Sequence, residues 1–250
     1  MDQIDTAAQA LAGCTRILVF TGAGISTESG IPDFRGPGGV WSRVDPEEFT
    51  LDRYLANPAT RKRGWAMSAE SGVLDASPNS AHRAIVDLWE AGLMISCVTQ
   101  NIDGLHQAAG LPDDAVVELH GNAHQTVCVS CGATQPTTVV LERITAGEDD
   151  PACADCGGIL KADVVFFGET MPRGEMLRAA IAAGEADAVL AVGSTLSVFP
   201  AASFPLEIAE AGHPFVIVNR GPTEMDDMAT ARIDGAAGEV LPDLVERLIL

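Results

Sequence analysis

Short apolar runs recur along the chain and predict strands that are buried on both faces. Each run has four or five residues, is rich in β-branched side chains, and is nearly continuous rather than alternating with polar residues. Such runs are typical of parallel sheets, which helices cover on both sides. The six predicted strands are residues 17–20, 94–98, 116–119, 164–167, 188–192 and 215–218.

Helix-like segments alternate with these runs. Within residues 81–90, four side chains recur at spacings of three and four, as on one face of a helix: His82, Ile85, Val86 and Trp89. Further helices are predicted at residues 2–12, 176–183, 201–211 and 239–250. Strands that alternate with helices of this length predict an α/β fold with a parallel, doubly wound sheet.

Two stretches interrupt the alternation and predict a second, smaller lobe. Residues 36–80 are polar and helix-like and are interrupted by glycines and prolines. Residues 122–162 show little regular apolar pattern. A chain of 250 residues can hold one large α/β domain with inserted modules. We therefore assign 1–35, 81–121 and 163–250 to a large lobe, and 36–80 and 122–162 to a small lobe.

Charge and hydropathy exclude several classes of partner. The formal net charge is −20, which repels a phosphate backbone, so no nucleic-acid partner is expected. No apolar stretch is long enough to predict a membrane span. The first predicted helix begins acidic and lacks the basic start of a secretory signal, so a cytoplasmic location is expected.

The cysteine spacing predicts a structural zinc site. Cys128 and Cys131 form one Cys-x-x-Cys pair, Cys153 and Cys156 form another, and 21 residues separate the pairs. Disulfides are the alternative, but paired spacing in a chain without a secretory signal favours metal. Four thiolates complete a tetrahedron and leave no open position, so the zinc is expected to be structural. Cys14 and Cys97 are expected to be buried, inert thiols.

A glycine-rich turn follows the first predicted strand and suggests a phosphate site. Gly22 permits the tight turn, and Gly24 lets the backbone approach a pyrophosphate at the start of a helix. The alternative is an ordinary strand-to-helix turn, because Thr27 replaces the usual third glycine. The acidic residue expected ~20 residues on is also missing, which argues against a dehydrogenase.

The loop after this turn carries an aromatic residue between two charges. Asp33 and Arg35 flank Phe34 in a stretch rich in proline and glycine. This composition suits a mobile cover over a ligand, and a salt-bridged loop is the alternative.

Polar side chains follow the second and third predicted strands. Gln100, Asn101 and Asp103 could bind ribose hydroxyls and a carboxamide, although Asn101 or Asp103 could also cap a helix. His120 stands at a strand end with an ordinary pKa near ~6.5, so it is a candidate general base or a hydrogen-bonded loop histidine. The other histidines are weaker candidates (His106, His124) or structural (His82, His213).

Taken together and in this order, these motifs resemble those of the sirtuins, bacterial-type NAD-dependent protein lysine deacylases. The resemblance extends over residues 17–240 and rests on the turn and loop at 22–36, residues 99–103, His120-Gly121, the four cysteines, residues 167–169 and residues 193–195. Position 194–195 reads Ser-Thr where many relatives read Thr-Ser, which keeps both hydroxyls.

The resemblance implies a Rossmann-like large lobe and a small lobe built from a zinc ribbon and a helical insertion. NAD, as co-substrate, and an acyl-lysine protein would enter the cleft between them. The implied catalytic residues are His120, as general base, and Asn101. The implied NAD-binding residues are Gly22, Ala23, Gly24, Ile25, Asp33, Phe34, Arg35, Gln100, Asn101, Ile102, Asp103, Gly193, Ser194, Thr195, Asn219, Arg220 and Ala237. The implied substrate-binding residues are His120, Val165, Phe167, Gly168, Glu169, Leu196, Ser197 and Val198, with the carbonyl of Val165 accepting the lysine N–H.

The resemblance further implies deacetylation that yields nicotinamide and 2′-O-acetyl-ADP-ribose. Relatives that remove succinyl or malonyl groups carry a tyrosine and an arginine three residues apart in the helical insertion. Here that stretch reads Trp65-Ala66-Met67-Ser68, and Asn57 stands three residues after Tyr54, so acetyl and other uncharged acyl groups are expected. Mono-ADP-ribosyl transfer, desuccinylation or demalonylation, and a non-catalytic NAD-sensing or interaction module are the alternatives. A monomer is expected.

Overall fold

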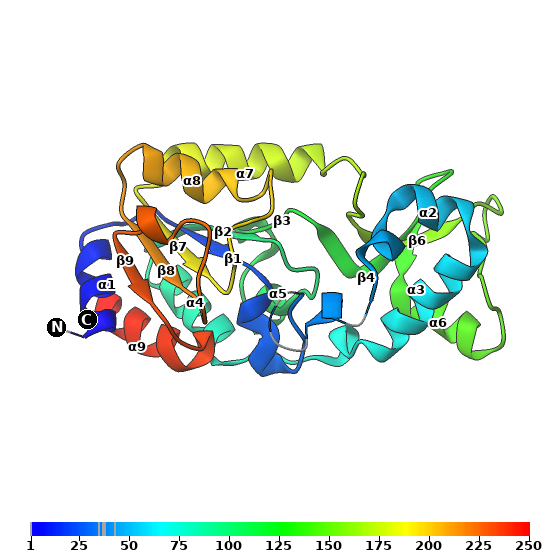
Figure 1. The fold of residues 1–250 in the computed structure, drawn as a ribbon, viewed down its shortest axis with the longest axis horizontal. Helices are drawn as coiled ribbons and strands as arrows, with labels where there is room; N and C mark the ends of the chain where they lie inside the picture. Colours follow the sequence, from blue (N-terminus) through cyan, green and yellow to red (C-terminus); the bar gives the residue numbers. More distant parts are fainter. Residues whose placement is uncertain (1, 35, 37–38, 43) are drawn as a thin grey trace.

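A six-stranded parallel sheet forms the larger part of the molecule (Figure 1). The computed structural model describes residues 2–34, 36, 39–42 and 44–250. The strand order is β3-β2-β1-β7-β8-β9, and every neighbouring pair is parallel. The strands are β1 (Ile17–Thr21), β2 (Met94–Thr99), β3 (Val116–Glu118), β7 (Ala188–Val192), β8 (Phe215–Val218) and β9 (Ala231–Ile233).

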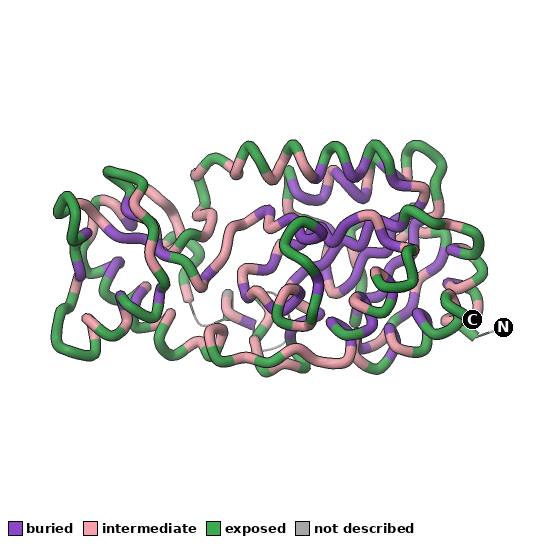
Figure 2. The backbone as a smooth tube through the Cα atoms, turned by 180° about the vertical axis from the view of Figure 1, so that it is seen from behind, coloured by how far each residue is buried: buried purple, intermediate pink, exposed green. Residues whose placement is uncertain are grey.

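Helices cover both faces of this sheet and bury it, as Figures 1 and 2 show. One face packs against α1 (Gln3–Leu11), α4 (Ser80–Glu90) and α9 (Ala237–Ile249), and the other against α7 (Arg173–Glu185) and α8 (Ser203–Glu210). Alternate residues of β1 point to opposite cores, Ile17 and Val19 to the first and Leu18 and Phe20 to the second. Two buried faces explain why the strands read as continuous apolar runs.

The strand order reverses between β1 and β7. Chain connections leave these two neighbouring strands in opposite directions, so a crevice forms outside their carboxyl ends, where open α/β sheets bind ligands. The predicted α/β fold with a parallel, doubly wound sheet is confirmed.

A three-stranded antiparallel sheet stands at the other end of the molecule, with strand order β5-β4-β6. It contains β4 (Gly121–Cys128), β5 (Thr134–Pro136) and β6 (Leu160–Val164), and α6 (Thr137–Thr145), α2 (Leu51–Ala56) and α3 (Pro58–Glu70) lie beside it. The remaining elements are α5 (Leu105–Ala109), η1 (Ala23–Ser29), η2 (Val40–Ser42), η3 (Pro46–Phe49), η4 (Val73–Asp75), η5 (Asp113–Ala115) and η6 (Asp226–Met228). The division into lobes at the stated boundaries stays a prediction.

One of the six strand predictions is wrong. Residues 164–167 do not add a strand to the parallel sheet, because β6 ends at Val164 and pairs antiparallel with β4. The apolar run after β6 leaves the sheet, and the Phe167 side chain is half exposed. In the region of the predicted zinc-ribbon module the chain forms β4, β5, α6 and β6. The short β9 was not predicted, because Arg232 interrupts its apolar pattern.

The segment 36–80 docks on the small sheet through a few specific contacts. Trp65 of α3 packs in one apolar cluster with Val140, Leu160 and two of the cysteines. The Arg61 guanidinium donates to both oxygens of Asp150, from Nε at 3.0 Å and from Nη2 at 2.7 Å. The Tyr54 hydroxyl donates to the carbonyl of Leu160 at 2.8 Å. These contacts join the two predicted insertions into one body.

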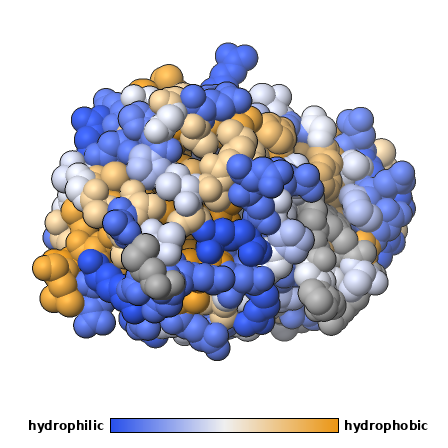
Figure 3. All heavy atoms as spheres, turned by 60° about the vertical axis from the view of Figure 1, so that its left-hand side comes forward, coloured by the Kyte–Doolittle hydropathy of each residue, from blue (hydrophilic) through white to orange (hydrophobic). Residues whose placement is uncertain are grey.

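The surface is mixed in polarity, and hydrophilic side chains are interspersed with apolar areas on the face shown in Figure 3. Among the described helices, none combines the length and the hydropathy that crossing a bilayer requires.

Two buried histidines pack against each other beneath the carboxyl ends of β1 and β2. The ring centroids of His82 and His106 lie 5.1 Å apart. Burial, with the neighbouring His106 second, lowers the pKa of His82 to about 3, and burial lowers the pKa of His106 to about 4. Both rings are therefore neutral at pH 7.

We predict that acidification from pH 7 to pH 5 destabilises the fold through this pair. Below pH ~6.5 both histidines are protonated in the unfolded state but stay neutral in the folded state. The free energy of unfolding therefore decreases as the pH falls from ~6.5 toward the lowered pKa values of the folded state. Between pH 7 and pH 5, each histidine should lower the free energy of unfolding by about 2 kcal/mol, and the pair by about 4 kcal/mol. Urea unfolding at the two pH values measures the loss.

Substitution separates the two contributions. His106→Gln should show about half of the wild-type loss between pH 7 and pH 5. The exposed His213 supplies the control, since His213→Gln should lose as much as wild type. A His106→Gln chain with the full wild-type loss would show that His106 is not held neutral in the folded state.

Candidate functional site

The glycine-rich turn packs directly on the loop that follows β7. The Gly24 N–H donates to the Gly193 carbonyl at 2.8 Å, and the Gly22 N–H donates to the Val192 carbonyl at 3.0 Å. A Cβ on Gly24 would lie 2.7 Å from the Gly193 Cα, and one on Gly22 would lie 2.9 Å from the Ser194 Cβ. Gly193 also has a left-handed φ of 62°. The glycines thus let two loops meet at the crevice between β1 and β7.

Gln100 bridges the loops that follow β2 and β7. Its side-chain amide donates to the Ser194 Oγ at 2.9 Å and to the Thr21 carbonyl at 3.3 Å. The Ser194 Oγ in turn accepts the Leu196 N–H at 3.1 Å, and the Thr195 and Ser197 hydroxyls lie 2.8 Å apart. The structure therefore brings together the predicted residues of both loops.

A buried polar chain lies between the turn and the loop after β2. The Asn101 side-chain amide donates to the Ser26 Oγ at 3.1 Å, and this hydroxyl donates to the Asp103 carboxylate at 2.7 Å. The other carboxylate oxygen of Asp103 accepts the Leu105 N–H at 3.0 Å. Asp103 therefore has both roles that the sequence left open, since it joins the polar cluster and also binds the N–H that begins α5.

Sequence reasoning missed Ser26 as a member of this site. The sequence did place Ser26 in the glycine-rich turn, two residues after Gly24. Its partners come from 75 and 77 residues away, so only the fold reveals its bonds to Asn101 and Asp103. His82, which had been assigned a structural role, also approaches this cluster, with Nε2 3.5 Å from the Ser26 Oγ.

His120 stands between β3 and β4 with its ring fixed by one hydrogen bond. The Nδ1 lies 2.9 Å from the carbonyl of Gln100, so Nδ1 carries the proton and Nε2 keeps a lone pair in the neutral ring. Burial lowers the pKa of His120 below its usual value, and the bond to Gln100 opposes this. The ring is therefore unprotonated at neutral pH, as a general base must be.

The loop after the turn folds back on itself. The Asp33 carboxylate accepts the Gly36 N–H at 2.8 Å, and the Val40 N–H donates to the Asp33 carbonyl at 2.9 Å. The side chain of Phe34 is 38% exposed, which is high for an aromatic ring beside a crevice. Arg35, predicted to bind NAD, lies outside the described residues.

The remaining described residues of the predicted NAD site lie after β8, at the start of α9, in the turn and in the loop after β2. Asn219 follows β8 and donates to the carbonyls of Arg220, at 3.3 Å, and Gly221, at 3.0 Å. Ala237 is buried at the start of α9, next to Gly238, whose N–H donates to the Glu28 carboxylate at 2.6 Å. Ala23, Ile25 and Ile102 lie in the turn and in the loop after β2.

The predicted substrate segment after β6 is held by the predicted helical insertion. The Phe167 N–H donates to the Phe49 carbonyl at 2.9 Å, and the Leu51 N–H donates to the Phe167 carbonyl at 3.1 Å. The Glu169 carboxylate turns inward and accepts the Lys161 ammonium at 3.0 Å. Gly168 is exposed, and across the crevice Leu196 is buried, Ser197 is exposed and Val198 is half-buried.

The four cysteines have the geometry of a tetrahedral zinc site. All four sulfur atoms lie within 4.8 Å of one another. The Cys128–Cys156 and Cys131–Cys153 sulfurs are 3.5 and 3.8 Å apart, close to the ~3.8 Å edge of a tetrahedron with Zn–S bonds of ~2.3 Å. The residues therefore fit zinc.

The remaining cysteines differ from each other. Cys97 is fully buried in β2, and burial raises the pKa of its thiol, as expected for an inert group. Cys14 is only half-buried, so the prediction of burial is wrong for this residue. It lies in the connection between α1 and β1, before the strand begins at Ile17.

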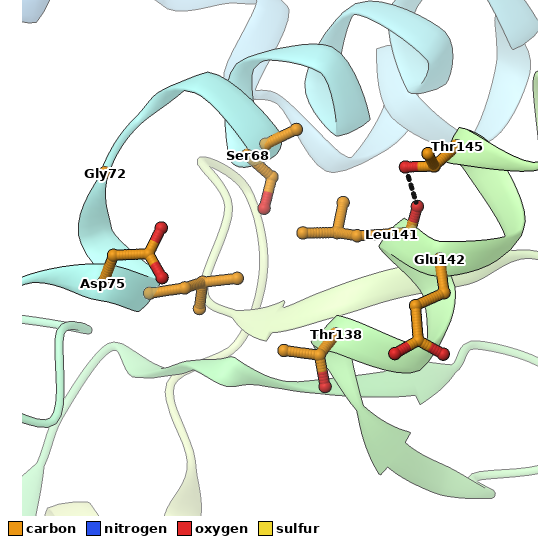
Figure 4. A pocket seen from close by; sticks show the side chains of 9 residues that line it. Ser68, Gly72, Asp75, Thr138, Leu141, Glu142 and Thr145 are labelled. Carbon is orange, nitrogen blue, oxygen red and sulfur yellow. Dashed lines mark hydrogen bonds between the residues drawn. The ribbon is translucent and has the colours of Figure 1, made fainter.

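A surface pocket of about 360 Å³ lies apart from these residues, between α3, η4 and α6 (Figure 4). Asp75 and Glu142 place carboxylates on its rim, and Leu141 contributes to its wall. None of the predicted site residues lines it. The crevice at the strand ends, and not this pocket, therefore holds the candidate chemistry.

Comparisons with known proteins agree on one family. The model of the Sir2 family matches residues 22–200. The chain is 44% identical over 241 residues to NAD-dependent protein deacetylase 2 of Streptomyces coelicolor, which covers 95% of this chain and 100% of the relative. It is 40% identical over 249 residues to NAD-dependent protein deacetylase 1 of Pyrobaculum aerophilum, covering 99% and 95% of the two chains.

Solved structures of Sir2 enzymes have the same fold. A structure described as the basis for the mechanism and regulation of Sir2 enzymes superposes with a TM-score of 0.90 at 42% identity, over 99% of this chain and 98% of that one. A Sir2 complex with a p53 peptide and NAD+ gives a TM-score of 0.88 at 35% identity, over 98% of both chains. The chain therefore belongs to the Sir2 family.

Proposed function

We propose that this protein is an NAD-dependent protein lysine deacetylase. It converts acetyl-lysine protein, NAD and water into lysine protein, nicotinamide and 2′-O-acetyl-ADP-ribose. The observation that carries the proposal is the convergence of His120 and the Ser26–Asp103–Asn101 chain on the loop 100–103, beside the glycine-rich turn. Relatives named as NAD-dependent protein deacetylases, and Sir2 complexes with acetylated and propionylated peptides, support it.

NAD binds along the carboxyl ends of β1, β2, β7 and β8. The pyrophosphate lies beside the glycine-rich turn, whose Gly22 and Gly24 let it pack closely on the loop that follows β7. Asn101 and Asp103 line the pocket of the nicotinamide and its ribose. Because Ser26 joins these two side chains, their positions are fixed before NAD arrives.

His120 acts as the general base. Departure of nicotinamide leaves an electron-poor ribose C1′, which the acyl oxygen of the lysine attacks to give an alkylimidate. The Nε2 of His120 then takes a proton from a ribose hydroxyl, so that the 2′ oxygen can attack the imidate carbon. The bond from Nδ1 to the Gln100 carbonyl fixes the tautomer that makes Nε2 basic.

The acyl-lysine protein binds beside residues 165–169 and 196–198. An added strand in this place uses main-chain hydrogen bonds, which tolerate many sequences. The carbonyl of Val165 accepts the N–H of the acyl-lysine side chain. The protein is proposed to act as a monomer, without nucleic acid, in the cytoplasm.

The proposed zinc ion has a structural role and is held by Cys128, Cys131, Cys153 and Cys156. Bound zinc supplies cross-linking of the two cysteine turns rather than a site for substrate. Each turn closes on a left-handed glycine, Gly132 and Gly157, both with a φ of 74°. The N–H groups of these glycines donate to the carbonyls of Cys128 and Cys153 at 2.9 and 2.8 Å.

The direct test incubates the purified protein with NAD and an acetyl-lysine peptide and identifies the products by mass spectrometry. Deacetylated peptide and O-acetyl-ADP-ribose in equal amounts support the proposal. Transfer of ADP-ribose to an acceptor protein without deacetylation would instead make the chain a mono-ADP-ribosyltransferase.

We predict that His120→Gln lowers kcat about 10²–10⁴-fold, because the base that activates the ribose hydroxyl is lost. His213→Gln is the matched control and should keep wild-type kcat, since this exposed ring lies outside the site. Steady-state deacetylation at saturating NAD measures both. Retention of more than about a tenth of wild-type kcat by His120→Gln would contradict the assignment.

The pH profile follows from the lowered pKa of His120. Its neutral form is the base, so kcat/KM should stay flat from pH 8 down to ~6.5 and fall only below that value. A profile that already falls between pH 8 and pH 7 would place the essential pKa above the usual histidine value and would argue against His120.

We predict that removal of zinc unfolds the three-stranded sheet and abolishes deacetylation, because this segment has few apolar residues to hold it alone. Cys128→Ser should lose bound zinc, measured by elemental analysis, together with activity. Cys14→Ser is the control and should retain one zinc per chain. A zinc-free protein with full activity would show that the four sulfurs do not support the site.

We predict that acetyl-lysine and propionyl-lysine peptides are cleaved faster than succinyl-lysine peptides of the same sequence. The Tyr54 hydroxyl is already bonded to the Leu160 carbonyl, and Asn57 offers no positive charge to an acyl carboxylate. Comparison of kcat/KM for the three peptides should show a difference of about tenfold or more. Faster cleavage of the succinyl peptide would reverse the stated preference.

A further inference from the structure

One of only two lysines in the chain is buried next to the proposed substrate segment. Lys161 lies on β6, and its side chain is 4% exposed. The other, Lys62, lies on α3 and pairs with Asp149 at the surface, where both side chains are well exposed. An ammonium group withdrawn from water requires good partners to offset its desolvation, so the contacts of Lys161 should have fixed geometry.

Lys161 holds both ends of the segment that follows its own strand. The Nζ donates to the Val164 carbonyl at 2.6 Å and to the Glu169 carboxylate at 3.0 Å. The same carboxylate oxygen of Glu169 accepts the Phe166 N–H at 3.0 Å. The Nζ also lies 4.9 Å from the centre of the Phe166 ring, within reach of a cation–π interaction. One ammonium thus closes residues 164–169 into a compact loop.

The outer side of this loop contacts the rest of the proposed site. The Val165 N–H donates to the carbonyl of His120 at 2.9 Å, so the loop and the proposed base share a main-chain bond. The Phe166 ring packs edge-on against Tyr54, with centroids 5.1 Å apart. Within the described part of the chain, no donor lies on the carbonyl of Val165. This carbonyl is therefore free to accept a hydrogen bond from a ligand.

We propose that Lys161 is a positioning residue for the substrate, which folds residues 164–169 so that the Val165 carbonyl meets the amide N–H of the acyl-lysine. The inference rests on the proposed deacetylase function. Loss of the ammonium leaves the Val164 carbonyl and the Glu169 carboxylate without their shared donor, and the loop loosens around Val165. Substrate binding then suffers although Lys161 itself touches no substrate.

The first experiment replaces Lys161 with methionine, which fills similar space without a charge. The dissociation constant and the KM for an acetyl-lysine peptide should rise about tenfold or more, with the NAD dissociation constant within about twofold of wild type. Lys161→Arg, which keeps the charge, should recover most of the affinity. Lys62→Met is the matched control and should match wild type, because Lys62 pairs with Asp149 at the exposed surface of α3.

A modified peptide tests whether Lys161 acts through the Val165 carbonyl. An Nε-methyl-Nε-acetyl-lysine peptide lacks the N–H that this carbonyl accepts. Wild type should bind it weakly, measured by fluorescence anisotropy with labelled peptides, and Lys161→Met should add no more than about a twofold further loss. Equal losses on both peptides would overturn the proposal, as would an unchanged affinity of Lys161→Met for the ordinary acetyl peptide.

Zinc content and unfolding separate positioning from a loss of fold. A Lys161→Met chain whose activity falls only in step with its bound zinc would show a structural role and overturn the proposal. If that variant does not fold, Glu169→Gln removes the charge partner while keeping the side-chain shape, and it should raise the peptide dissociation constant in the same direction. A wild-type chain that releases no deacetylated peptide overturns the proposed function itself, whatever the variants do.

Discussion

The hydrogen bond between the His120 ring and the carbonyl of Gln100 is the interaction on which the site depends. It is the first of three bonds that join the segment 120–124 to carbonyls of the loop after β2. The Ala123 N–H donates to the Ile102 carbonyl at 2.8 Å, and the His124 Nε2 lies 2.9 Å from the Asp103 carbonyl. Because buried carbonyls need donors, each bond holds one point of the proposed NAD loop against the segment that carries the proposed base.

These bonds also join the two sheets mechanically. Residues 121–124 are the first part of β4, which ends at Cys128, one of the four clustered cysteines. The same strand pairs with β6, from which Lys161 reaches the loop 164–169. A change in the cysteine cluster can therefore reach the crevice through a single strand and its hydrogen bonds. The cysteine cluster can therefore affect the geometry of the crevice although it takes no part in the proposed reaction.

The sequence predicted those features that depend on local pattern. Three such features can each be recognised within a short stretch of sequence. They are the parallel strands with two buried faces, the paired cysteines, and the polar residues that follow β2 and β3. The bonds of Ser26 and Lys161 could not be predicted, because only the fold brings their partners to them. β4 was not predicted as a strand, because polar residues interrupt any apolar run in it, among them His124, whose ring bonds to the Asp103 carbonyl.

The strand predicted at 164–167 failed for a related reason. Four apolar residues in a row are typical of a strand between two layers of helices, but only two adjacent residues of β6, Leu160 and Lys161, are fully buried. The apolar run begins where β6 ends, and within it the Phe166 ring packs against Tyr54 while Phe167 is half exposed. Burial of a lysine eight residues before its carboxylate partner leaves no periodic signal in the sequence.

Thr27 explains why this turn departs from the dinucleotide-binding pattern of dehydrogenases. In that pattern the third glycine allows an α-helix to pack closely against the first strand. Here the element after the turn is the 3₁₀ helix η1, and Thr27 is exposed on it, with its hydroxyl donating to the Gly24 carbonyl at 3.0 Å. Because Thr27 faces solvent, this position does not require a glycine. Positions 22 and 24 do require glycine, because a Cβ at either one would clash with Gly193 or Ser194.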